Sequence, residues 1–120
     1  MKQKIQLIEK EVRDKLELVR ISEELDKDFE KFTGIAFLDS FGLNSILASS
    51  SVDGVELFPK NFEVLFLQSN VFVPADTRFF TIHSRKAGGK KIEIEFKDGG
   101  TAGSYPYTLK IYLRLENDKD

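Results

Sequence analysis

The sequence predicts a mainly β protein: an antiparallel β-sandwich of about seven strands with an N-terminal helical arm. Polar and apolar residues alternate over 91–97 and again over 107–115, which is the period of a half-buried strand. From residue 33 onward, short apolar runs are separated by turn-type residues, whereas residues 2–33 contain neither glycine nor proline. A jelly roll is one form of such a sandwich, and a small barrel is the alternative.

Length and composition set the class of protein. With 120 residues, 41% of them hydrophobic and 32% charged, the chain has the size and balance of one soluble domain. Eleven phenylalanines and no tryptophan predict a phenylalanine-rich core. A net charge of −2 argues against specific nucleic acid binding, which requires a strong basic excess. The absence of cysteine excludes disulfides, thiolate metal sites and cysteine nucleophiles.

The N-terminal sequence contains no apolar run of the length found in signal peptides. No other stretch of the chain is apolar enough to span a bilayer. We therefore expect synthesis in the cytoplasm and no membrane span, and the missing cysteines agree with a reducing compartment.

Residues 1–31 are predicted to form a charged helical arm. Apolar residues recur at spacings of three and four, as on one face of a helix: Ile5, Ile8, Val12, Leu16 and Val19. Ser22 is a suitable N-cap for a second helical stretch, and Gly34 is a suitable stop. The alternative is that residues 16–21 form a strand.

Residues 32–117 are predicted to form the sandwich, followed by a short frayed tail at 118–120. Asp53-Gly54 is a strong two-residue hairpin signal between two strands. The run 62–67 is almost continuously apolar, which favours a central strand buried on both faces. The predicted strands are 32–38, 45–52, 55–58, 62–67, 77–84, 90–97 and 107–117.

The last two predicted strands are expected to pair as an antiparallel hairpin that anchors the fold. The connection between them, 98–106, is rich in glycine and contains a proline, and such loops commonly join antiparallel neighbours. A basic loop at 85–91 leads into this hairpin.

Few residues point to catalysis, and we expect neither an enzyme nor a cofactor. His83 is the single histidine, so a zinc site or a Ser/His triad cannot be assembled in a conventional pattern. The aspartates of the β region, Asp39, Asp53, Asp76 and Asp98, fall at expected turns, where aspartate is favoured for backbone hydrogen bonding. A hydrolase built on two converging loop aspartates is the weakest of the hypotheses.

Three groups of residues are candidates for contacts with a partner. The first is apolar but lies between loop signals, where polar residues are the norm: Val71, Phe72 and Val73. The second belongs to the basic loop and suits an anionic surface: Arg85, Lys86, Lys90 and Lys91. The third, Tyr105 and Tyr107, would either stack on a sugar or partner or hold the 98–106 loop on the sheet.

Three stretches, 32–38, 53–59 and 105–113, together with the charged arm, resemble small structural proteins of bacteriophage particles. The resemblance covers residues 32–116 and transfers no functional residues. It implies a non-catalytic capsid-type subunit of a virion, a homo-oligomer that packs against copies of itself or other coat proteins. The alternative function is a carbohydrate-binding or other ligand-binding module that uses the loop from Asp98 to Tyr107.

Overall fold

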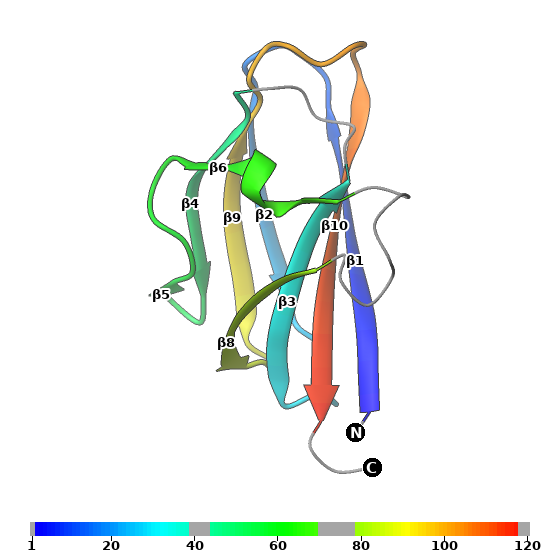
Figure 1. Ribbon diagram of the computed structural model, residues 1–120, viewed down its shortest axis with the longest axis vertical. Coiled ribbons are helices and arrows are strands. Elements are labelled where there is room, and N and C mark those ends of the chain that lie inside the picture. Colours follow the sequence, from blue (N-terminus) through cyan, green and yellow to red (C-terminus); the bar gives the residue numbers. More distant parts are fainter. Residues whose placement is uncertain (1, 39–43, 70–78, 118–120) are drawn as a thin grey trace.

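The computed structural model describes residues 2–38, 44–69 and 79–117, which form two sheets packed face to face (Figure 1). The predicted mainly β sandwich is therefore confirmed. The first sheet contains β1 (Lys2–Val12), β10 (Tyr107–Asn117), β3 (Lys31–Leu38), β7 (Gln68–Ser69) and β8 (Phe80–Lys86). The second contains β2 (Leu18–Glu24), β9 (Lys91–Lys97), β4 (Ile46–Val52), β5 (Val55–Glu56) and β6 (Phe62–Glu63).

The strands pair in a nested pattern. The first strand pairs with the last, β1 with β10, and β2 pairs with β9. Further inward, β3 pairs with β8, and β4 pairs with β5 across the hairpin turn. All four pairs are antiparallel. In addition, β10 pairs with β3 and β9 pairs with β4. The chain is thus one long antiparallel ribbon folded over on itself, which brings both termini to the same end (Figure 1).

The core lies between the inner faces of the two sheets. The alternation over β9 and β10 is confirmed, because every second side chain of each strand is buried: Ile92, Ile94 and Phe96 on β9, and Leu109, Ile111, Leu113 and Leu115 on β10. Phe32 and Phe37 of β3 and Leu47 of β4 are also fully buried. These side chains form one hydrophobic cluster between the sheets, as expected for two facing sheets.

The predicted terminal hairpin is wrong. β9 lies in the second sheet between β2 and β4, whereas β10 lies in the first sheet between β1 and β3. Residues 98–106 cross from one sheet to the other, so the two strands face each other across the core. The alternation could not distinguish a hairpin within one sheet from two strands in facing sheets, because each strand buries one face in both arrangements.

The predicted helical arm is also wrong. Residues 2–12 and 18–24 are strands β1 and β2, one in each sheet, so the alternative of a strand near 16–21 was closer. Ile8 and Val12 point into the core, while Ile5 and Leu7 are exposed. A spacing of four fits both the strand period of two and the helical period, which is why Ile8 and Val12 were ambiguous.

The remaining predictions are confirmed in part. Strands 32–38 and 45–52 correspond to β3 and β4, and the hairpin at Asp53-Gly54 has the positive φ values, 53° and 78°, of a type I′ turn. The central strand at 62–67 is wrong: β6 has two residues, and the 3₁₀ helix η1 (Val64–Leu67) follows it. Val64 and Leu67 are buried and the two residues between them are exposed, because a 3₁₀ helix repeats every three residues.

Candidate interaction surface

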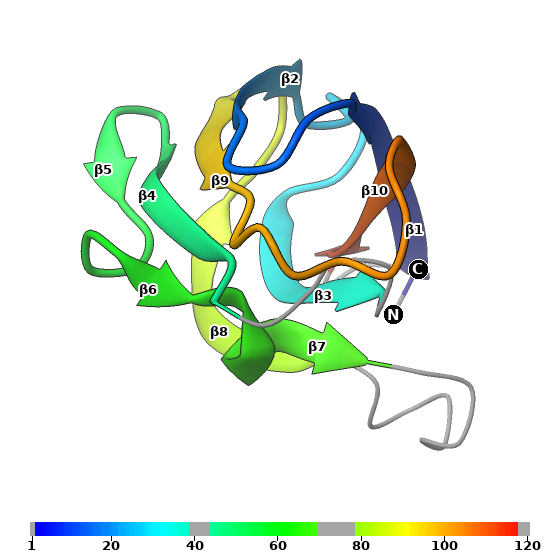
Figure 2. The same ribbon diagram turned by 90° about the horizontal axis from the view of Figure 1, so that it is seen from above.

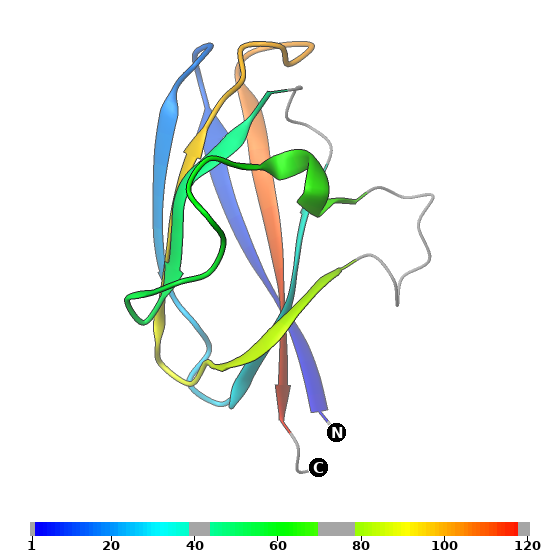
Figure 3. The same ribbon diagram turned by 60° about the vertical axis from the view of Figure 1, so that its left-hand side comes forward.

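The two sides of the sandwich are closed in different ways. On one side, β1 and β2 are bridged by Gln6, whose side-chain amide donates to the Glu24 carbonyl at 3.0 Å and accepts from the Asp26 amide at 3.1 Å. Lys4 adds an ion pair with Asp26. On the other side, the sheets end at β8 and at β4 with β5, as the view from above shows (Figure 2). The segment from β5 to η1 crosses between the sheets there (Figure 3).

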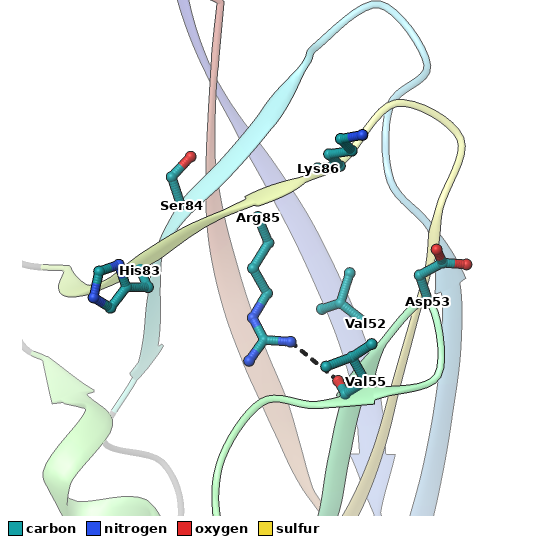
Figure 4. A pocket seen from close by; sticks show the side chains of 7 residues that line it. All are labelled: Val52, Asp53, Val55, His83, Ser84, Arg85 and Lys86. Carbon is teal, nitrogen blue, oxygen red and sulfur yellow. Dashed lines mark hydrogen bonds between the residues drawn. The ribbon is translucent and has the colours of Figure 1, made fainter.

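A groove runs along this second side, and we call it the open-side groove. It consists of two adjoining hollows of about 380 and 350 Å³ that share His83 and Arg85. The basic half is lined by Val52, Asp53, Val55, His83, Ser84, Arg85 and Lys86 (Figure 4). The aromatic half is lined by Leu57, Phe58, Phe62, Phe80, Thr81, Ile82, His83 and Arg85.

Arg85 spans the gap between the sheets. It stands opposite the buried Phe32 on β3, so its side chain starts on the inner face of the first sheet. The guanidinium then reaches the second sheet, where it donates to the Val55 carbonyl at 3.1 Å (Figure 4). It also donates to the Glu56 carbonyl at 2.6 Å. Both acceptors are neutral. Within the described part of the chain, neither Arg85 nor Lys86 has a carboxylate partner.

The predicted basic loop is only partly a loop. Arg85 and Lys86 belong to β8 and Lys91 begins β9, which leaves Lys90 in the turn between them. Lys90 forms an ion pair with Asp53 at 3.6 Å. The structure therefore brings two of the four predicted residues, Arg85 and Lys86, to the open-side groove.

A ladder of phenylalanine rings forms the aromatic half. Phe58 stacks on Phe62 with ring centroids 4.7 Å apart and meets the edge of Phe80 at 5.9 Å. Phe66 of η1 continues the ladder, 5.5 Å from Phe62. Phe58 is buried, but Phe80 is 40% exposed and Phe66 is 68% exposed. Sequence reasoning missed this feature because it placed the whole 62–67 run in the core.

The tyrosines of the 98–106 connection serve the fold. Asp98 is 1% exposed and accepts hydrogen bonds from the hydroxyls of Tyr105 at 2.5 Å and Tyr107 at 2.6 Å. It also accepts from the backbone amides of Leu16 at 3.1 Å and Gly100 at 2.9 Å. The hydroxyls of both tyrosines are thus bonded to Asp98, and these bonds hold the connection in place.

This cluster shifts three pKa values. Burial alone would raise the pKa of Asp98, but the hydrogen bonds from the two tyrosines and two backbone amides outweigh it and lower the pKa below the ordinary 3.8. Burial raises the pKa of Tyr107 far above 10.0, and its hydrogen bond to Asp98 raises it further. The pKa of Tyr105 is raised for the same two reasons. The carboxylate is therefore held charged and the phenols neutral.

The outer faces of the two sheets differ in character. Ile5 and Leu7 of β1 are exposed on the first sheet, and Arg114 lies flat over Gly34 nearby, with its guanidinium 5.5 Å from the Phe79 ring. On the second sheet, ionic and hydroxyl side chains predominate: Arg20 donates to Glu95 at 3.0 Å, and Ser49 donates to the same carboxylate at 2.8 Å.

The other candidate residues are placed as follows. Val71, Phe72 and Val73 lie outside the described residues, as do Asp39 and Asp76. Across residues 2–38, 44–69 and 79–117, no group of three acidic or histidine side chains could hold a metal ion. None of the helical structure in those ranges is long and apolar enough to cross a membrane.

Comparisons of the chain with protein-family models, with curated proteins and with solved structures found no match.

Proposed function

We propose that this chain is a non-catalytic assembly protein, a capsid-type component of a virion that associates with copies of itself or with other coat proteins. We also infer that its sandwich is of the jelly-roll type, in which an eight-stranded antiparallel ribbon is rolled into two sheets. The nested pairing of β1 with β10, β2 with β9, β3 with β8 and β4 with β5 supports this inference. Jelly rolls recur in viral capsids.

The observation that carries the proposal is the apolar surface at the open side. Three exposed apolar side chains lie along the groove: Phe80 lines its aromatic half, Phe66 continues the ring ladder, and Val55 lines the basic half. Burying apolar surface contributes about 25 cal/mol per Å², and contiguous exposed apolar patches mark interaction sites in soluble proteins. Ile5 and Leu7 on the outer face of β1 offer a second, smaller contact area.

Sedimentation velocity over a wide range of protein concentrations tests the proposal. We expect the average mass of the full chain to rise with concentration, and Phe66→Ser to weaken this association without unfolding the protein, because the ring is largely exposed. Leu18→Ser is the matched control, since Leu18 is 42% exposed on the polar second sheet. A chain that stays monomeric throughout contradicts the proposed self-association, and equal loss of association in both variants contradicts its location at the open side.

A further inference from the structure

We propose that the open-side groove binds an extended segment of a partner protein in which carboxylates precede apolar side chains. The segment lies along β8, with its acidic residues beside Arg85 and Lys86 and its apolar residues beside Phe80. This inference rests on the proposed function only in taking the ligand to be a protein.

The free edge of β8 offers the backbone contacts for such a segment. β8 runs over seven residues and, within the described residues, pairs with β3 alone. Its other edge faces the groove, and most of its side chains are exposed. An unpaired edge of this kind binds an extended peptide through main-chain hydrogen bonds, and pockets for alternate side chains supply specificity.

Arg85 decides which segments the edge accepts. A charged side chain that points inward from an edge strand keeps the edge from pairing indiscriminately. The guanidinium already donates to two neutral carbonyls, so its positive charge is not neutralised there. A segment that covers this charge without a carboxylate leaves it desolvated and unpaired, which is strongly unfavourable. The occupant must therefore carry an acidic residue at this point.

The distribution of charge along the groove sets the direction of the segment. The basic residues of β8, Arg85 and Lys86, lie at its C-terminal end. Asp53 also lines this half of the groove, but it is paired with Lys90. The phenylalanine ladder lies at the N-terminal end, around Phe80. A segment antiparallel to β8, like β3 on its other edge, meets the basic half first. Its order from the N-terminus is therefore acidic, then apolar.

Fluorescence anisotropy with a labelled synthetic peptide, Ser-Asp-Glu-Ser-Val-Thr-Phe-Thr-Val, tests the inference on the full chain; its two adjacent acids point to opposite faces of an extended segment, as Arg85 and Lys86 do on β8. Two control peptides accompany it: one with Asn and Gln in place of Asp and Glu, and one with the reverse order. We expect the acidic-first peptide to bind at least about 10-fold more tightly than the neutral one. Its affinity should fall when salt is raised from about 50 mM to about 500 mM. Equal binding of the neutral or the reversed peptide overturns the inference.

Matched variants place the binding site. Lys86→Gln removes an exposed charge at the groove, and Lys97→Gln removes an exposed charge from β9, at a distance. We expect Lys86→Gln to weaken peptide binding about 3-fold and Lys97→Gln to leave it unchanged. Equal effects of the two variants overturn the inference. Failure of peptide binding with persistent self-association refutes this inference alone, whereas peptide binding by a strictly monomeric chain refutes the proposed self-association alone.

Discussion

Asp98→Asn tests whether the buried carboxylate holds the crossing between the two sheets. The side chain accepts four hydrogen bonds, from two phenols and two backbone amides. The asparagine amide has the same shape but a single acceptor oxygen, and its nitrogen only donates. Oδ2 accepts three of these bonds and Oδ1 accepts that of Tyr107, so the asparagine oxygen can replace Oδ2 while the Tyr107 hydroxyl loses its acceptor. The three bonds that remain are no longer made to a charged group.

The expected loss follows from these contacts. Hydrogen bonds to a charged group contribute about 1.5–3 kcal/mol each, and an unsatisfied buried donor costs about 1–3 kcal/mol. Because bonds within one cluster are not additive, we expect Asp98→Asn to lower the free energy of unfolding by about 3–4 kcal/mol. That is a large part of the roughly 5–15 kcal/mol typical of a domain.

Urea unfolding followed by circular dichroism measures this loss. Asp53→Asn is the matched control, because Asp53 is exposed in a turn with a φ of 53° that asparagine also tolerates. We expect the control to change the free energy of unfolding by no more than about 0.5 kcal/mol. A loss below about 1 kcal/mol for Asp98→Asn would refute the role assigned to the carboxylate.

The pH dependence of stability, the packing around Gly34 and the two N-terminal strands can each be tested. Folding lowers the pKa of Asp98 and raises that of Tyr107. The stability that Asp98 contributes is therefore present above pH 3.8 and is lost as pH falls through its folded-state pKa, whereas the stability that Tyr107 contributes is present below pH 10 and declines above it. Urea unfolding at several pH values measures both effects, and a free energy of unfolding that does not change with pH contradicts them. In Gly34→Ala, the new Cβ would lie 3.0 Å from the Arg114 guanidinium carbon. Hydrogen bonds to the Thr33 hydroxyl and the Thr33 carbonyl, both at 3.0 Å, hold this guanidinium in place, so its displacement weakens them and the melting temperature should fall by about 4 °C; an unchanged melting temperature counts against this packing. Deletion of residues 1–31 removes an edge strand from each sheet, so circular dichroism should show no cooperative thermal transition, and a folded product would contradict the observed pairing.

The sequence predicts the β architecture well because a strand that is buried on one face shows alternating apolar and polar residues. Ile92, Ile94 and Phe96 alternate with charged residues, and all three are buried as expected. The alternation does not show which strands pair with each other. β9 and β10 are consecutive but lie in different sheets. The connection between them bonds to distant positions, from the Leu16 amide to Asp98 and from the Gly99 amide to Ser45, and no local pattern reveals such contacts.

The candidate surface was predictable only in part. Arg85 and Lys86 stood out as basic residues in a region without acids, and they do line the groove. Phe62 and Phe66 were hidden by the assumption that a continuous apolar run is buried. A period of three over 64–67 was the available signal, but four residues are too few to distinguish a 3₁₀ helix from a strand.

The closure of the two sides explains why the open-side groove is the stronger candidate for function. On the β1 side, the Gln6 amide donates to the Glu24 carbonyl and accepts from the Asp26 backbone amide, which satisfies one acceptor and one donor across the gap and adds no net charge. On the β8 side, Arg85 makes the equivalent bridge to carbonyls alone and leaves a positive charge next to exposed rings such as Phe80. A bridge needed only for stability would be better made by a neutral amide, since an unpaired charge at an apolar edge is unfavourable once it is desolvated. The arrangement becomes favourable when a partner supplies both the carboxylate and the apolar cover, and this is the physical basis for placing the partner at β8.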